Sequence, residues 1–323
     1  MKSLRNRDLS LDLIKAFAIY LVIMDHLISG TDGTDNPFRT FIYSCHMPLF
    51  FFVSGVLAYK KIDSIKNVFA FCAKKCRLLI PVFVFGLGNV IILNQNVGEF
   101  IIWHKFGLWF LWTLFLFFAI YTISQALLVN NNNRFIEIFV LLIPALICVY
   151  LRKFKDTDLG GVFNFLNLYN YVFFLAGVMI KRYDTNKIIA KDSLQLIFFS
   201  IYVTGLATGI PALNIPMKLC GVLFAYMVSL RLTTNWSGDN LTTWQYALMK
   251  IGQSSLFIYV LHYYLIRGIR HLPETIHSIV YISPCYYLLL YSLVAIFVIF
   301  VCVIISEILK TNKYIRQIAF GVK

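Results

Sequence analysis

The feature that most constrains this chain is a series of long apolar runs that contain few or no charged residues. A helix that crosses the hydrocarbon core of a membrane needs roughly 20 apolar residues, so a chain of 323 residues has room for about ten such helices. Charged residues make up 14% and hydrophobic residues 59% of the chain, whereas about a quarter of a soluble domain is charged. The composition therefore excludes an ordinary soluble domain.

The apolar runs also predict the fold class. Backbone groups that face lipid must be hydrogen-bonded internally, so the spans are helices or form a closed barrel. The runs are continuous rather than alternating, which excludes the barrel. We therefore predict an all-α fold, a polytopic transmembrane helix bundle of about ten spans, in a single integral membrane domain over residues 1–323. The predicted spans are Leu11–Ile28, Phe38–Tyr59, Leu78–Leu93, Leu108–Val129, Phe135–Leu151, Leu166–Ile180, Ser193–Ile210, Met217–Leu232, Tyr246–Ile266 and Cys285–Ser306.

The basic residues predict the orientation. With these spans, 20 of the 29 Lys and Arg residues lie on the side of the two termini and 8 on the other, while Lys15 lies inside the first span. Lys and Arg collect in cytoplasmic loops, so both termini should be cytoplasmic. This bias explains the net charge of +14 without a nucleic-acid partner, although a basic cytoplasmic face would also suit an anionic cytosolic substrate. The first apolar run lacks a small-residue cleavage pattern, so we interpret it as a span rather than a cleaved signal.

The seven cysteines predict neither a disulfide framework nor a metal site. Most of them lie inside apolar runs, where cysteine behaves as a small hydrophobic residue. Cys72 and Cys76 are four residues apart, but no matching pair of Cys or His follows them.

Two ionisable residues share one face of the first predicted span. Lys15 and His26 are eleven residues apart, which places them about 20° apart in azimuth and roughly 16 Å apart along a helix axis. Ionisable residues inside a span usually face a protein interior or a water-filled cavity. Lys15 could instead extend to the cytoplasmic edge and pair with Asp12, and His26 could make a structural hydrogen bond between helices. Asp25 adjoins His26 but points about 100° away from it.

Later segments add further polar residues. His46 precedes Pro48 in the second span, and two more histidines, His26 and His262, also fall in the outer halves of their spans. Convergence of the three would suit proton transfer. Other residues have an ordinary structural interpretation beside a functional one. Ser54 and Gly55 permit close helix packing, Lys74 and Arg77 fit the cytoplasmic excess of basic residues, and Trp109 fits an interfacial anchor.

Taken in order, these segments resemble the acyltransferase-3 family of membrane acyltransferases over nearly the whole chain. Lys15 and His26 resemble the family's basic residue and histidine separated by ten residues, and Leu11–Lys15 is similar to its Asp-x-x-Arg start. His46-Met47-Pro48 through Ser54-Gly55 resembles the family's second-span motif. Lys74-x-x-Arg77 resembles the family's Arg-x-x-Arg signature, with Lys in place of the first Arg. Trp109-Phe110-Leu111 and Ser255 through His262 are similar to the middle and late segments.

The resemblance implies transfer of an acyl group, most often acetyl, from cytosolic acyl-CoA to a hydroxyl of a surface polysaccharide, peptidoglycan or lipid-linked sugar. It implies a plasma (inner) membrane location and acetyl-CoA or another acyl-CoA as a substrate, with no permanently bound cofactor. Homo-oligomer formation is left open. The candidate residues fall into three groups: catalytic His26, with His46 and His262 as partners; donor-binding Lys15, Lys74 and Arg77; and substrate-binding Asp12, Asp25, Ser54, Trp109 and Tyr259.

The sequence leaves other functions open. One is acylation of an amino group or a small metabolite. Another is a proton-coupled transporter or lipid flippase, in which the same histidines would carry protons, and a third is a membrane scaffold in which the polar residues only pack. An enzyme must release free CoA, a transporter must move solute without consuming acyl-CoA, and a scaffold should tolerate replacement of His26.

Overall fold

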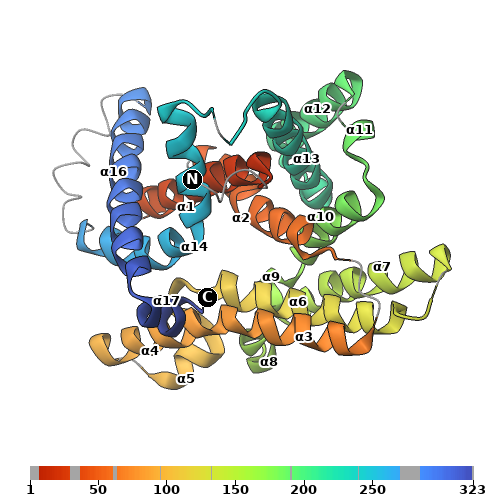
Figure 1. The fold of residues 1–323 in the computed structure, drawn as a ribbon, viewed down its shortest axis with the longest axis horizontal. Coiled ribbons are helices and arrows are strands. Elements are labelled where there is room, and N and C mark those ends of the chain that lie inside the picture. The colour runs from red at the N-terminus through yellow and green to blue at the C-terminus, as the bar shows by residue number, and fades with distance from the viewer. Residues whose placement is uncertain are drawn as a thin grey trace. The chain divides into compact units, whose positions relative to one another are not determined.

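The computed structural model describes residues 7–29, 37–60, 64–94, 96–131, 133–189, 191–238, 240–269 and 284–321. These residues are mainly helical and include no strand, which confirms the predicted all-α fold (Figure 1). The predicted outer loop between Arg267 and Pro284 lies mostly outside the described residues.

The chain divides into two compact units, each made of two stretches of sequence. Unit 1 contains residues 1–53 and 184–308, and unit 2 contains residues 54–183 and 309–323. The division falls inside helices α2 and α16. The prediction of a single domain over residues 1–323 stays a prediction.

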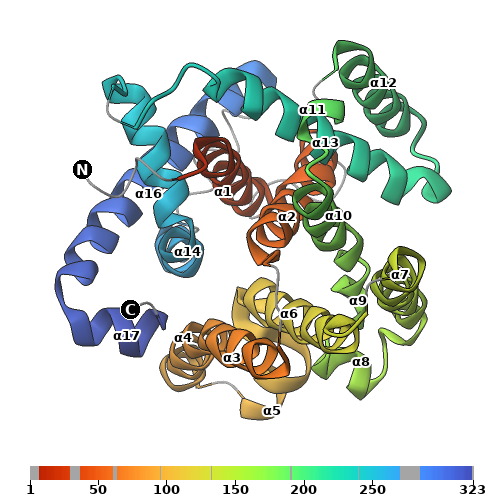
Figure 2. The same ribbon diagram turned by 45° about the vertical axis from the view of Figure 1, so that its right-hand side comes forward.

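Unit 1 holds the N-terminal helix and the C-terminal half of the chain. Its helices α12 and α13 pack side by side (Figures 1 and 2), as do α1 and α14. The tyrosine hydroxyl of Tyr20 on α1 donates to Ser292 on α16, with the oxygens 2.8 Å apart. The elements of unit 1 are α1 (Leu9–Ser29), most of α2 (Pro37–Ala58), α11 (Asn186–Ile189), α12 (Asp192–Thr208), η5 (Pro211–Leu213), α13 (Asn214–Thr233), α14 (Thr243–Ile269) and most of α16 (Pro284–Thr311).

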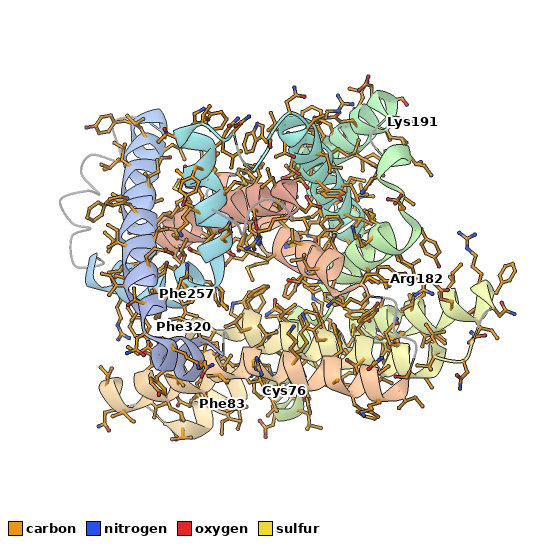
Figure 3. The ribbon with its side chains drawn as sticks, in the orientation of Figure 1. Cys76, Phe83, Arg182, Lys191, Phe257 and Phe320 are labelled. Carbon is orange, nitrogen blue, oxygen red and sulfur yellow. The ribbon has the colours of Figure 1, made fainter. Side chains whose placement is uncertain are left out.

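Unit 2 is formed mainly by the middle of the chain. Its α3 packs along α6, and the short C-terminal helix α17 packs on α4 through the rings of Phe85 and Phe320, whose centroids are 5.3 Å apart (Figure 3 labels Phe320). The elements are α3 (Ile65–Lys75), η1 (Cys76–Leu78), α4 (Leu79–Leu93), α5 (Val97–Glu99), η2 (Phe100–His104), η3 (Lys105–Gly107), α6 (Trp109–Leu128), α7 (Arg134–Leu151), η4 (Arg152–Phe154), α8 (Asp158–Val162), α9 (Phe165–Leu168), α10 (Tyr171–Tyr183) and α17 (Lys313–Phe320).

A buried lysine joins two loop segments of unit 2. The Lys105 ammonium donates to the carbonyl of Ile102, 2.9 Å away, and to the carbonyl of Gly161. Burial disfavours the charged form and lowers the pKa of Lys105 to about 8. The two backbone carbonyls explain why a lysine is tolerated here, because buried donors are costly unless they are hydrogen-bonded.

Six of the described helices are long and apolar enough to cross a membrane, so the chain is an integral membrane protein, although the predicted count of ten spans is not confirmed. The other four predicted spans are also helical. Two of them, α10 and α12, have 13 and 17 residues and are short for a span, while α1 and α14 carry ionisable residues. The six segments are Phe38–Ala58, Ile65–Ile92, Trp109–Leu128, Arg134–Phe154, Pro211–Thr233 and Leu288–Thr311.

No disulfide joins the cysteines in the part of the chain that the structure describes. Cys45, Cys72, Cys76, Cys148, Cys220 and Cys302 are all free thiols there. The side chain of Cys285 lies outside the described residues.

Candidate active site

Helices α1 and α14 run in the same direction, as their contacts show. Leu9 of α1 packs with Met249 of α14 at one end, and His26 lies beside His262 at the other, with ring centroids 5.2 Å apart. Between them, Gly252 faces the backbone of α1, where an added Cβ would lie 2.0 Å from the carbonyl oxygen of Asp12. A glycine is therefore required at this crossing, and the close approach brings the two histidines together.

The geometry of His262 fixes which of its nitrogens is basic. Its ring is buried, and its Nδ1 lies 3.0 Å from the carbonyl oxygen of Ile258 one turn earlier. A carbonyl oxygen can only accept, so Nδ1 carries the proton and Nε2 holds the lone pair of the neutral ring. Nε2 is buried and has no hydrogen-bond partner among the described residues. A buried polar atom without a partner is unusual in proteins and is a feature of functional sites.

His46 on α2 has the same tautomer as His262. It is buried, and its Nδ1 lies 2.6 Å from the carbonyl oxygen of Ile42. The ring of Tyr43 meets it edge-on at 5.4 Å, and His26 lies close enough to His46 for an electrostatic interaction. The structure thus brings His26, His46 and His262 into one cluster within unit 1, as the convergence hypothesis predicts.

Two tyrosines of α14 complete the surroundings of the cluster. Tyr259 is buried, with its ring centroid 5.9 Å from that of His262. Tyr263 meets the ring of His26 edge-on at 6.1 Å. The candidate Tyr259 therefore lies at the cluster, and its role in substrate binding stays a prediction.

Asp25 is paired with a residue that the sequence argument did not select. Its carboxylate is buried, and Oδ1 lies 3.5 Å from Nε of Arg39, although neither of these two atoms has a hydrogen bond within the described ranges. The guanidinium of Arg39 also lies over the ring of Tyr43, 5.2 Å from its centroid. Asp25 thus faces an arginine on α2, which agrees with its predicted direction away from His26. The only sequence signal for Arg39 was its position four residues before Tyr43, one turn along a helix.

The start of α1 holds a second group of ionisable residues. The Lys15 ammonium lies 2.5 Å from Asp12 Oδ1, and Nε of Arg7 lies 3.3 Å from Asp12 Oδ2. The pairing of Lys15 with Asp12, one of the two interpretations from sequence, is confirmed. The donor-binding role of Lys15 and the substrate-binding role of Asp12 stay predictions.

The remaining candidates belong to unit 2. Lys74 is exposed and Arg77 is half-buried, on either side of the junction between α3 and η1. Neither has an ion pair in the described part of the chain. The neighbouring Lys75 instead packs over the ring of Phe118, 3.9 Å from its centroid. The C-terminal end of α3 is therefore a cationic segment in which the charges of Lys74 and Arg77 are not neutralised by a described carboxylate.

Ser54 and Trp109 also lie in unit 2. Ser54 is half-buried on α2, and at the adjacent Gly55 an added Cβ would lie 1.9 Å from the carbonyl oxygen of Phe174, so the predicted close packing at this pair is confirmed. Trp109 is the first residue of α6, as an anchor at a span end would be. Their substrate-binding roles stay predictions.

Comparisons with known proteins agree with the resemblance seen in the sequence. The acyltransferase-3 family, described as an acyltransferase domain, matches residues 8–310. Nodulation protein NolL of Sinorhizobium fredii is 38% identical over 82 residues, which cover 24% of this chain and 22% of that protein. Nodulation protein NolL of Mesorhizobium japonicum is 46% identical over 59 residues, or 16% of each chain.

These two matches span at most about a fifth of the curated relatives, so they add little to the family match. No solved structure matches the chain. The family match covers nearly all of the chain and includes the helices that carry the histidine cluster. The chain therefore belongs to the acyltransferase-3 family and is an integral membrane protein.

Proposed function

We propose that this membrane acyltransferase moves an acetyl group from cytosolic acetyl-CoA to a hydroxyl of a saccharide or lipid-linked sugar. The observation that carries the proposal is the pairing of His26 with His262. The two rings are adjacent, and the lone pair of His262 Nε2 is buried without a partner in the described part of the chain. A hydroxyl is a weak nucleophile until a base removes its proton, and histidine exchanges protons near neutral pH.

In the proposed reaction His26 acts as the general base. It takes the proton of the acceptor hydroxyl while the oxygen attacks the thioester carbonyl and forms a tetrahedral oxyanion. The oxyanion collapses, the carbon–sulfur bond breaks, and the CoA thiolate leaves. The proton then passes from the His26 imidazolium to the thiolate, which restores the base.

His262 would position His26 rather than react. Its unprotonated Nε2 can act only as a hydrogen-bond acceptor. The ring of His26 lies beside it and carries an N–H that could donate to this nitrogen. Such a bond would hold the His26 ring in one tautomer and stabilise its protonated form, as the aspartate of a Ser-His-Asp triad does for its histidine. His46 is the second candidate for this role.

The donor phosphates would contact Lys74 and Arg77. Both are accessible cations without an acidic partner among the described residues, and the guanidinium can form paired hydrogen bonds with a phosphate. Lys15 is proposed as a further donor contact that shares its charge with Asp12.

The test of the proposed function is the release of free CoA thiol by purified protein in nanodiscs, with acetyl-CoA and hydroxyl or amine acceptors. We expect thiol release that depends on a saccharide acceptor, with the acetyl group found on that acceptor by mass spectrometry. Acetylation of amines alone would favour the N-acylation alternative. Solute or lipid movement in sealed vesicles without consumption of acetyl-CoA would contradict the proposal and favour a transporter or flippase.

We also propose a plasma (inner) membrane location with both termini in the cytoplasm, because Lys and Arg are concentrated on that side. This orientation predicts that α8 is outside. An Asp158→Cys variant should therefore react with an impermeant thiol reagent in intact cells. The exposed native Cys76 is an internal control, since it should react only after lysis. The reverse pattern would show that the orientation is inverted.

A further inference from the structure

Unit 1 contains an apolar cavity between α1, α2, α12 and α13. Its volume is about 360 Å³, and the side chains of Phe17, Phe41 and Phe199 at its edge are partly exposed. Two hydroxyls in its lining are already hydrogen-bonded: Tyr202 with Ser44, and Ser229 with a backbone carbonyl of its own helix. The cavity is large enough for a ligand, but its lining offers mainly hydrocarbon contacts.

A second cavity of similar volume lies between α2, α12 and α13. Its lining includes two cations, Arg39 and Lys218, together with Asn214, and no carboxylate. Arg39 is partly neutralised by Asp25, but the two side chains are 3.5 Å apart and the Nε atom has no hydrogen bond to any described residue. This cavity therefore suits an anion that accepts several hydrogen bonds, as a phosphate does.

One hydrogen bond joins the linings of the two cavities. Ser44 lines the charged cavity and Tyr202 lines the apolar one, and their hydroxyl oxygens are 2.6 Å apart. A molecule with an anionic group joined to a hydrocarbon chain would occupy both cavities. The pantetheine arm of CoA fits less well than a lipid chain, because its amides would lose their hydrogen bonds in an apolar lining.

We propose that these cavities bind a membrane lipid with an anionic phosphate headgroup. The phosphate contacts Arg39 and Lys218, and the hydrocarbon chain lies in the apolar cavity. The proposal concerns lipid binding and does not depend on the proposed acyl transfer. It links the lipid to the histidine cluster, because a phosphate at Arg39 competes with Asp25, the residue before His26.

The test is saturable binding of dioleoyl phosphatidylglycerol to the purified full-length protein in zwitterionic detergent, with phosphatidylcholine and inorganic phosphate as comparisons. Lys218→Gln removes one charge-assisted contact and should weaken phosphatidylglycerol binding about tenfold or more. Lys218→Arg should restore binding. Lys191→Gln is the matched control on the same unit, because Lys191 is exposed at the start of α12 and lines neither cavity (Figure 3). It should bind as the wild type does.

A second variant tests the hydrocarbon cavity. Ala225 lines it, so Ala225→Phe should fill part of the volume and weaken phosphatidylglycerol binding in protein whose melting temperature is unchanged. Equal binding of phosphatidylcholine and phosphatidylglycerol would overturn the proposal, as would wild-type binding by Lys218→Gln. Displacement of the lipid by inorganic phosphate at comparable concentration would show a free-phosphate site and would also overturn it.

Discussion

The polar groups around the two ends of helix α1 differ in whether they have partners. Near its start, the Asp12 carboxylate has a cation at each oxygen, with Lys15 at 2.5 Å and Arg7 at 3.3 Å. Near its end, His26 lies beside His262, whose buried Nε2 has no hydrogen-bond partner among the residues that the structure describes. At the first end each buried charge has an opposite charge beside it, as buried ion pairs usually do. At the second end the lone pair of His262 Nε2 remains able to accept a hydrogen bond.

The difference teaches how one helix can serve both packing and chemistry. The same partner helix, α14, contacts both ends of α1, at Gly252 and at His262. At the first end it supplies a glycine that allows close contact, and at the second it supplies the histidine that lies beside His26. The close contact thus sets the position of the histidine pair, so the two ends should respond differently to substitution.

The largest expected effect comes from His26→Ala. Removing a general base typically lowers the rate by about 10²–10⁴-fold. The variant should keep its expression level and its affinity for CoA, because neither depends on the proton exchange. The measurement is acetyl transfer and CoA binding by the same purified sample. If His26→Ala loses donor binding together with activity, the residue supports the fold or the donor site instead.

A smaller effect is expected at the helix crossing. Gly252→Ala places a methyl group where the backbone of α1 lies, and must separate the two helices. Because a displacement of about 1 Å can lower a rate on the order of 10²-fold, transfer should fall toward that limit and the melting temperature should decrease. Gly88→Ala on α4 is the matched control, since nothing lies within 4 Å of its added methyl group. Wild-type behaviour of both variants would show that the crossing does not position the histidines.

The third prediction concerns the donor. Arg77→Ala and Lys74→Ala should each weaken CoA binding by about 10- to 150-fold, because a hydrogen bond to a charged group contributes roughly 1.5–3 kcal/mol. Lys66→Ala on α3 removes the same charge from an exposed position in the first turn and should leave binding unchanged. Unchanged binding in all three variants would assign these cations to membrane orientation alone.

The sequence predicted the apolar helices better than the amphipathic ones. Long apolar runs identify a span such as Trp109–Leu128 directly, because burial in lipid requires them. The short α17 contains basic residues between its apolar ones, and α3 begins the apolar segment Ile65–Ile92 but carries three lysines. A search for runs without charge therefore predicted neither helix. The count of ten spans is not confirmed for a related reason. Helices such as α1 are buried by other helices, so they can carry polar residues that a helix facing lipid could not carry.

The candidate site was predicted in part. The family resemblance and the helical spacing selected His26 and His262, and the structure places their rings together. Arg39 was missed because it pairs with Asp25 across two helices, and sequence spacing describes neighbours only within one helix. The tautomer of His262 was also unpredictable, because it depends on a contact with a backbone carbonyl.

The most direct test of the central claim compares His26→Gln with Lys15→Gln, two substitutions on the same helix, at saturating acetyl-CoA. Glutamine keeps hydrogen-bonding capacity but cannot take up a proton. We predict that His26→Gln keeps its melting temperature and loses at least about 10²-fold in kcat. Lys15→Gln should instead lower the melting temperature, raise KM for acetyl-CoA and keep its kcat, because it breaks the pair with Asp12. A well-folded His26→Gln protein that retains more than about a tenth of the wild-type kcat would contradict the assignment of His26 as the base.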